Sequence, residues 1–127
     1  MRVTGIGGVF FKAKDSAVLR EWYRRHLEIQ MEEWGGATFR WQTQGNPHGV
    51  GSTTWTVFDE DTTYFGSTAA RFMINYRVEN LETLLSTLRE EGCSVDDKIE
   101  KSEFGKFGWV TDPEGNRIEL WEPPPGQ

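Results

Sequence analysis

Apolar and polar residues alternate at both ends of the first half of the chain, with a helical pattern between them. In residues 3–14, Val9, Phe11 and Ala13 fall on one face of an extended chain, which is typical of a half-buried strand. Residues 15–27 begin with an Asp–Ser pair suited to a helix N-cap and then repeat apolar side chains at helical spacing. Three shorter strands are predicted after this helix, at residues 29–34, 38–43 and 52–59. The Gly, Asn and Pro content of residues 44–51 predicts a loop between the last two.

The second half repeats this order of patterns. Residues 70–78 alternate as a strand, and Asn80 is then a suitable N-cap for a leucine-rich helix that Gly92 ends. Three further strands are predicted at residues 94–100, 106–112 and 116–122. The tail at 123–127 begins with three prolines, which have no N–H to donate to a sheet.

The two halves can be superposed along the sequence. An offset of 65 carries Val9 onto Ile74 and Asp15 onto Asn80, and an offset of 64 carries Trp55 onto Glu119. Because strand and helix starts both coincide, the sequence predicts an α+β fold made of two βαβββ modules. We expect a single domain over residues 1–127, with module one at 3–59, a connector at 60–69, module two at 70–122 and the Pro-rich tail at 123–127.

Composition narrows the class of protein. The chain has 127 residues, of which 36% are hydrophobic and 27% charged, as in a soluble globular domain. A net charge of −6 disfavours nucleic acid as a partner, and no apolar run approaches the roughly 20 residues of a membrane span. Cys93 is the only cysteine and the N-terminus has no signal-like apolar core, so we expect a cytoplasmic protein without disulfides.

The ending "DPEGNRIELWEP" places an unusual set of side chains on one face of a strand. Ile118 and Leu120 point one way, so Arg117, Glu119 and Trp121 must share the other face. The same parity puts other aromatic and polar residues on inward faces, whereas the helix-facing sides are apolar. Apolar walls with a few converging polar groups are typical of a ligand cleft. The candidate ligand-binding residues are Phe10, Trp55, Met73, Asn75, Arg117, Glu119 and Trp121.

A purely structural interpretation of these residues stays open. Buried charges have to be paired, so Asn75, Arg117 and Glu119 are also consistent with a structural ion-pair network. Trp55 and Trp121 are equally consistent with core or subunit contacts.

The segments "FFKAKD", "WYRRHL", "MINYRVENLETLLSTLREEG" and "DPEGNRIELWEP" together resemble the vicinal-oxygen-chelate superfamily of glyoxalase I, bleomycin-resistance proteins and extradiol dioxygenases. The resemblance covers residues 3–122 and implies a curved mixed sheet around a cleft, and commonly a homodimer. In metal-using members four inward strand positions can bind a divalent ion, and these correspond to Gly8, Met73, Glu119 and a position near Trp55. Only Glu119 offers a suitable ligand atom, because glycine has none, the indole N–H is a donor and a thioether is too soft. We therefore expect no family-type metal centre and no cofactor.

Two functions from different classes follow. In the first, the protein binds a small organic molecule in the cleft and catalyses no reaction. In the second, it is a metal-independent or atypical metal-dependent lyase, isomerase or dioxygenase-type enzyme, with Glu119 as general base beside Asn75 or Arg117. A third, weaker hypothesis makes the second module an assembly surface without a ligand.

Overall fold

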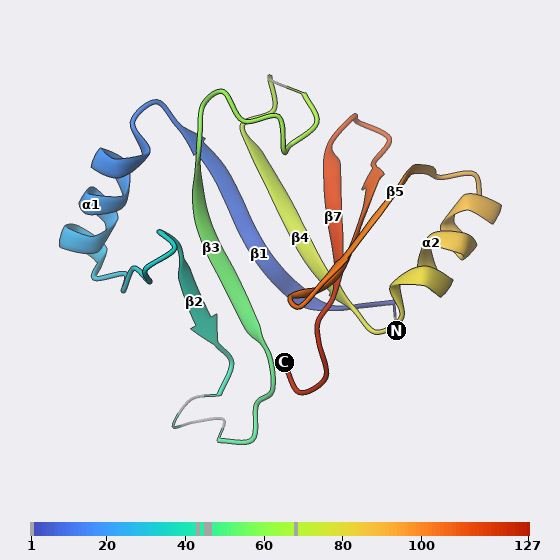
Figure 1. The fold of residues 1–127 in the computed structure, drawn as a ribbon, viewed down its shortest axis with the longest axis horizontal. Helices are drawn as coiled ribbons and strands as arrows, with labels where there is room; N and C mark the ends of the chain where they lie inside the picture. Colours follow the sequence, from blue (N-terminus) through green and yellow to red (C-terminus); the bar gives the residue numbers. More distant parts are fainter. Residues whose placement is uncertain (1, 43, 45–46, 68) are drawn as a thin grey trace. The chain divides into compact units, whose positions relative to one another are not determined.

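The computed structural model describes residues 2–42, 44, 47–67 and 69–127. The chain divides into two compact units, which we call the N-terminal unit (residues 8–72) and the C-terminal unit (residues 1–7 and 73–127). Within the described residues there are seven strands and two helices, drawn in Figure 1. Their bounds are β1 Val3–Ala13, α1 Ser16–Leu27, β2 Ala37–Arg40, β3 Ser52–Asp59, β4 Phe72–Val78, α2 Leu81–Glu90, β5 Ser94–Ser102, β6 Gly105–Thr111 and β7 Arg117–Glu122.

In the N-terminal unit, β3 lies between β2 and β1, parallel to β1 and antiparallel to β2. The Asp15 carboxylate accepts a hydrogen bond from the Val18 N–H at 3.1 Å, so the predicted N-cap of α1 is confirmed. Three rings then hold α1 against the strands: Tyr23 on the helix contacts Phe11 on β1 and Trp55 on β3, with centroids 5.9 and 5.1 Å apart.

The prediction of a strand at residues 29–34 is wrong. Glu28 ends α1 in the left-handed conformation (φ 56°), which turns the chain. The Glu32 N–H then donates to the Gly36 carbonyl and the Gly35 N–H to the Glu32 carbonyl, at 2.8 and 2.9 Å. These backbone groups pair within the segment, so they are not used in a sheet ladder.

The strands predicted at 38–43 and 52–59 correspond to β2, which ends at Arg40, and to β3. Thr43 at the end of that predicted strand, Gly45 and Asn46 in the predicted loop, and Thr68 in the predicted connector lie outside the described residues.

In the C-terminal unit the strand order is β4-β7-β6-β5, with β4 parallel to β7 and the other pairs antiparallel. Helix α2 begins after the N-cap Asn80 and packs Leu81 and Leu85, both completely buried, onto one face of these strands. Gly108 on β6 allows this close approach, because a Cβ there would lie 2.8 Å from Leu85 Cδ1. Burying each leucine contributes roughly 1.5–3 kcal/mol to the free energy of unfolding. The apolar face of the C-terminal unit is therefore covered by α2.

Across the described residues, neither helix is long and apolar enough to cross a membrane.

Candidate functional site

Glu119 lies at the centre of a buried polar cluster in the C-terminal unit. It is in register with Asn75 on β4 and with Trp109 on β6, so the three side chains share one face of adjacent strands. Asn75 Nδ2 donates to Glu119 Oε1 at 2.7 Å, and Trp109 Nε1 donates to Glu119 Oε2 at 2.9 Å. The exposed fractions are only 1% for Glu119 and 2% for each of its partners. Both carboxylate oxygens therefore accept hydrogen bonds from neutral donors in a setting that excludes water.

Asn75 was one of the partners expected for Glu119, and that expectation is confirmed. Arg117, the other expected partner, donates instead to Asp96 on β5 at 3.1 Å. Its guanidinium also lies over the Trp109 ring, 5.1 Å from the centroid. The pKa of Asp96 is held below its usual value, first by the hydrogen bond from the Lys98 backbone N–H and then by Arg117.

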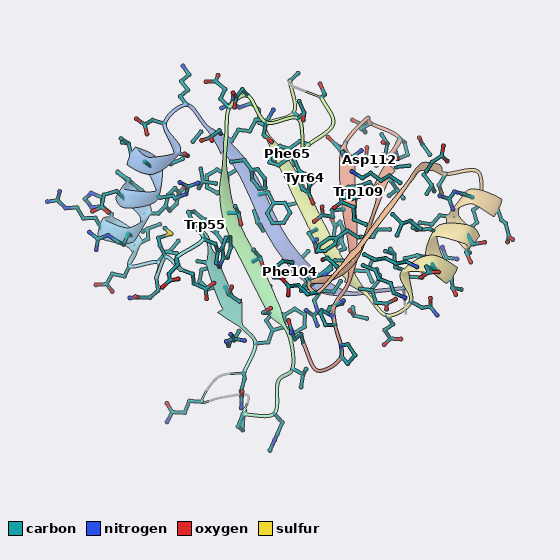
Figure 2. The ribbon with its side chains drawn as sticks, in the orientation of Figure 1. Trp55, Tyr64, Phe65, Phe104, Trp109 and Asp112 are labelled. Carbon is teal, nitrogen blue, oxygen red and sulfur yellow. The ribbon has the colours of Figure 1, made fainter. Side chains whose placement is uncertain are left out.

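A second arginine and tryptophan pair lies on β4 and β7, whereas the first lies on β7 and β6. The Arg77 guanidinium is 5.2 Å from the Trp121 ring and donates to the backbone carbonyl of Gln127 at 2.6 Å. Burial lowers the pKa of Arg77 from its ordinary value. Trp121 is itself fixed, because its Nε1 donates to the Phe104 carbonyl at 2.8 Å and its ring stacks on Phe107. Figure 2 shows Phe104 and Trp109 among the side chains of this unit.

On this face, Asn75 Oδ1, an acceptor, and Arg117 Nε, a donor, are buried and have no hydrogen-bond partner in the described part of the chain. Buried polar groups are usually paired, so unpaired atoms of this kind are uncommon. Asn75 Oδ1 lies against Gly7, where an added Cβ would be only 2.1 Å away. The face thus offers unsatisfied hydrogen-bonding capacity beside aromatic rings.

Phe10 and Trp55, the candidate residues of the first half, lie in the N-terminal unit on opposite faces. The prediction that they share an inward face is wrong. In the β1–β3 register Trp55 pairs with Val9 and Phe10 with Thr56, so Trp55 faces α1. The ring that lies beside Phe10 is Phe58, with centroids 5.5 Å apart.

The positions that correspond to a family metal site give a donor set that does not fit a divalent ion. Met73 is buried and offers a thioether, and Gly8 has no ligand atom. Both Glu119 oxygens already accept N–H donors that cannot themselves bind a cation. Within the described residues, no three His, Cys, Asp or Glu side chains lie close enough to share a metal ion.

Sequence reasoning missed Trp109 as a site residue. The predicted strand at 106–112 already placed Phe107 and Trp109 on one face by parity. The sequence did not show how β6 pairs with β7. In the structure that pairing sets Phe107 opposite Trp121 and Trp109 opposite Glu119.

Comparison with known proteins agrees with this fold. Residues 8–121 match the glyoxalase-like domain family, and because this is nearly the whole chain, the protein belongs to that family. No curated protein matches the chain at a significant level.

Three solved structures show how widely the fold is shared. A methylmalonyl-CoA epimerase from Mycobacterium tuberculosis is 21% identical, with a TM-score of 0.63 over 97% of this chain and 90% of that one. A Streptomyces coelicolor methylmalonyl-CoA epimerase variant in complex with 2-nitronate-propionyl-CoA is 14% identical, with a TM-score of 0.71 over 98% of both chains. A glyoxalase/bleomycin resistance protein/dioxygenase superfamily member from Vibrio splendidus 12B01 is 11% identical, with a TM-score of 0.60 over 92% of this chain and 98% of that one. The predicted superfamily and its α+β fold with a mixed sheet are confirmed. The second half has the predicted βαβββ order, whereas the first has the order βαββ among the described residues, because the strand expected at 29–34 is absent.

Proposed function

We propose that this glyoxalase-like protein binds a small organic molecule on the polar and aromatic face of its C-terminal unit, without a family-type metal centre. The observation that carries the proposal is the pairing of Glu119, whose two oxygens are occupied by Asn75 and Trp109. A buried carboxylate engaged in this way is a fixed structural element of the face. Arg117 and Trp121 are only partly buried and remain suitable for ligand contact.

The chemistry of the face favours an organic ligand with a flat or apolar part and a hydrogen-bonding group. Two arginine–tryptophan pairs present rings and guanidinium groups together, and Arg117 Nε is a buried donor without a partner among the described residues. Aromatic surface with a few polar groups is the usual composition of small-molecule sites.

The enzymatic alternative rests on the similarity to epimerases and on Glu119 as general base. A general base must come within about 2.6–3.2 Å of the proton that it removes. Glu119 could meet this requirement only after losing one of its two hydrogen bonds in a site that excludes water. The arrangement of its partners therefore favours binding over proton abstraction.

Mass spectrometry with methylmalonyl-CoA in D2O separates the two functions. If Glu119 is a base, the protein should catalyse exchange of the α-proton of this thioester for deuterium, and Glu119→Gln should abolish the exchange. We expect no exchange above the rate without protein. Catalysed exchange that depends on Glu119 would replace the binding proposal with the enzymatic one.

Binding itself is tested by a thermal-shift screen of organic acids and acyl-CoA thioesters. A compound that binds the folded state should raise the melting temperature of the wild type. The rise should shrink in Trp121→Ala and in Arg117→Gln, and remain in the surface control Arg40→Gln. Compounds that stabilise all four proteins equally would place the ligand elsewhere.

The metal-free part of the proposal has its own test. Purified protein should contain no stoichiometric zinc, nickel, manganese or iron by elemental analysis, and chelator should leave its melting temperature unchanged. About one tightly held ion per chain would refute this part.

A further inference from the structure

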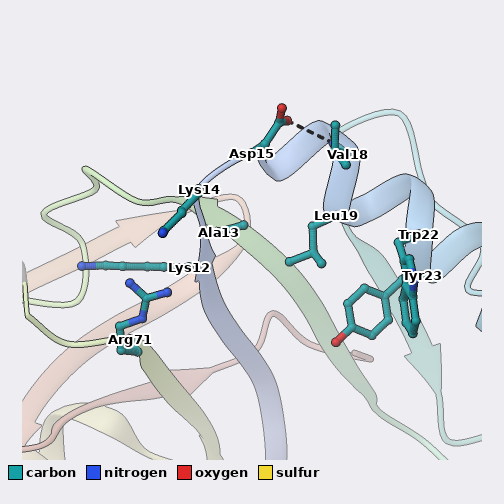
Figure 3. Close-up of a pocket in the computed structure, with 9 residues that line it drawn as sticks. All are labelled: Lys12, Ala13, Lys14, Asp15, Val18, Leu19, Trp22, Tyr23 and Arg71. Carbon is teal, nitrogen blue, oxygen red and sulfur yellow. Dashed lines mark hydrogen bonds between the residues drawn. The ribbon is translucent and has the colours of Figure 1, made fainter.

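The N-terminal unit has a pocket of its own at the end of β1. It has a volume of about 600 Å³ and is formed by the last residues of β1, the first two turns of α1 and Arg71, which precedes β4 (Figure 3). Volumes of roughly 300–1,000 Å³ are usual for small-molecule pockets. The pocket shares no lining residue with the face around Glu119.

One part of the pocket wall is cationic. Lys12, Lys14 and Arg71 line it, and Figure 3 shows their side chains gathered at the end of β1. Lys12 is buried, with its ammonium 5.5 Å from the centroid of the Phe65 ring. Lys14 and Arg71 are exposed, and neither forms an ion pair within the described residues.

The acidic residue in the pocket is already engaged. The Asp15 carboxylate accepts from the Val18 N–H as the N-cap of α1, which directs it to the helix. With three basic residues and one acidic residue in its lining, the pocket has a local excess of positive charge, although the chain as a whole has a net charge of −6. Such a pocket attracts anions and repels cations.

Another part of the wall is apolar and only partly covered. Trp22 is 49% exposed and Val18 is 64% exposed, and both line the pocket from α1. The Trp22 ring is held in place by edge contact with Tyr23, at a centroid distance of 5.1 Å. No residue of α1 is buried. A flat ligand would cover this apolar surface without requiring the helix to move.

We propose that this pocket binds a small aromatic organic anion, with its ring on Trp22 and Val18 and its acidic group beside Lys14 and Arg71. The apolar and cationic residues that line the pocket offer contacts for both parts of such a ligand. A metal cation is disfavoured by the lysines and arginine, and a neutral ring would use only half of the site.

A pair of fluorescent probes tests this proposal directly. The anion 8-anilinonaphthalene-1-sulfonate and the neutral N-phenyl-1-naphthylamine share an aromatic body and differ in the sulfonate. Both are titrated into wild type, Lys14→Gln, Arg71→Gln and Trp22→Ala at low salt. The matched controls are Arg40→Gln and Trp34→Ala, an exposed arginine and an exposed tryptophan of the same unit that do not line the pocket.

We expect the anion to bind wild type more tightly than the neutral probe, and salt near 0.5 M to remove the difference through screening. Lys14→Gln and Arg71→Gln should each raise the Kd of the anion about two- to fivefold, the range for an exposed ion pair. Their effect on the neutral probe should be small. Trp22→Ala should weaken both probes, and the two controls neither.

Equal affinity for the two probes in wild type would overturn the proposal. So would a loss of anion binding in Arg40→Gln as large as that in Arg71→Gln. Melting temperature and sedimentation coefficient are measured for each variant, so that unfolding or altered assembly is not mistaken for lost binding. Trp121→Ala, which should weaken a ligand bound on the face of the C-terminal unit, should leave the anion affinity of this pocket unchanged, and that outcome separates the two sites.

Discussion

Replacing Trp109 by Phe removes one hydrogen bond from the buried Glu119 and keeps an aromatic ring in the same place. Trp109 Nε1 is 2.9 Å from Glu119 Oε2, and both residues are almost completely buried. Because both residues are buried, water is a poor substitute for the lost donor, and removing this hydrogen bond is costly.

The magnitude can be estimated from the groups involved. A hydrogen bond to a charged group contributes about 1.5–3 kcal/mol, and the smaller ring adds about 1 kcal/mol of lost packing. We expect Trp109→Phe to lower the free energy of unfolding by about 2–4 kcal/mol, measured by urea denaturation. For a chain of this length that corresponds to a fall of roughly 10 °C in melting temperature. Trp34→Phe is the control, because Trp34 is exposed and should change stability by less than about 0.5 kcal/mol.

A double-mutant cycle with Glu119→Gln separates the hydrogen bond from the packing. The amide introduced by Glu119→Gln keeps one acceptor oxygen and presents one NH2 group, so one of the two donors, Asn75 or Trp109, would face another donor. In the Trp109→Phe background that conflict disappears. The double variant should therefore be more stable than the sum of the single effects indicates, by about 1 kcal/mol or more. Strict additivity, or equal effects of Trp109→Phe and Trp34→Phe, would refute this account of the cluster.

Three further predictions concern Gly7, Asp96 and the assembly that the family resemblance implies. Gly7→Ala should destabilise the protein by about 1–3 kcal/mol in urea, because its Cβ would lie 2.1 Å from Asn75 Oδ1 and displace that side chain from Glu119. The pKa of Asp96 is lower in the folded state than in the unfolded state, so its stabilising contribution is complete above the unfolded pKa of about 3.9 and is lost as pH falls through the folded pKa. The difference in unfolding free energy between wild type and Asp96→Asn should thus be constant near neutral pH and shrink below about pH 4. We also expect a homodimer at micromolar concentration in sedimentation velocity, and a monomer there would contradict that expectation.

The C-terminal half could be predicted in detail because its signals are local. Asn80 caps α2, and the "DPEGN" segment closes the β6–β7 turn through its own atoms, with Asp112 Oδ1 accepting from the N–H groups of Glu114 and Asn116. A turn of fixed length sets the register between the two strands that it joins. The shared face of Arg117, Glu119 and Trp121 is consistent with that register.

The N-terminal half was predicted less well because pairing there depends on distant segments. The face of the sheet on which Trp55 lies depends on the register between β1 and β3, two strands joined by a long connection. A shift of that register by one residue would move every side chain of the strand to the opposite face. The strand expected at 29–34 does not form, because Glu28 adopts a left-handed conformation that turns the chain. This conformation is uncommon for residues other than glycine, so the sequence does not predict it.

The contacts around Glu119 link it to the residues that the binding proposal assigns to the ligand. A carboxyl group that is almost completely buried requires partners, and Trp109 and Asn75 are neutral donors to its two oxygens. The same hydrogen bond that satisfies Glu119 fixes the orientation of the Trp109 ring. Arg117 lies over that ring, 5.1 Å from its centroid, and its guanidinium is directed by Asp96 at the same time. Under the binding proposal, Glu119 acts as a positioning residue for the partly exposed arginine, and the structural and ligand-binding interpretations of this face then rest on one network.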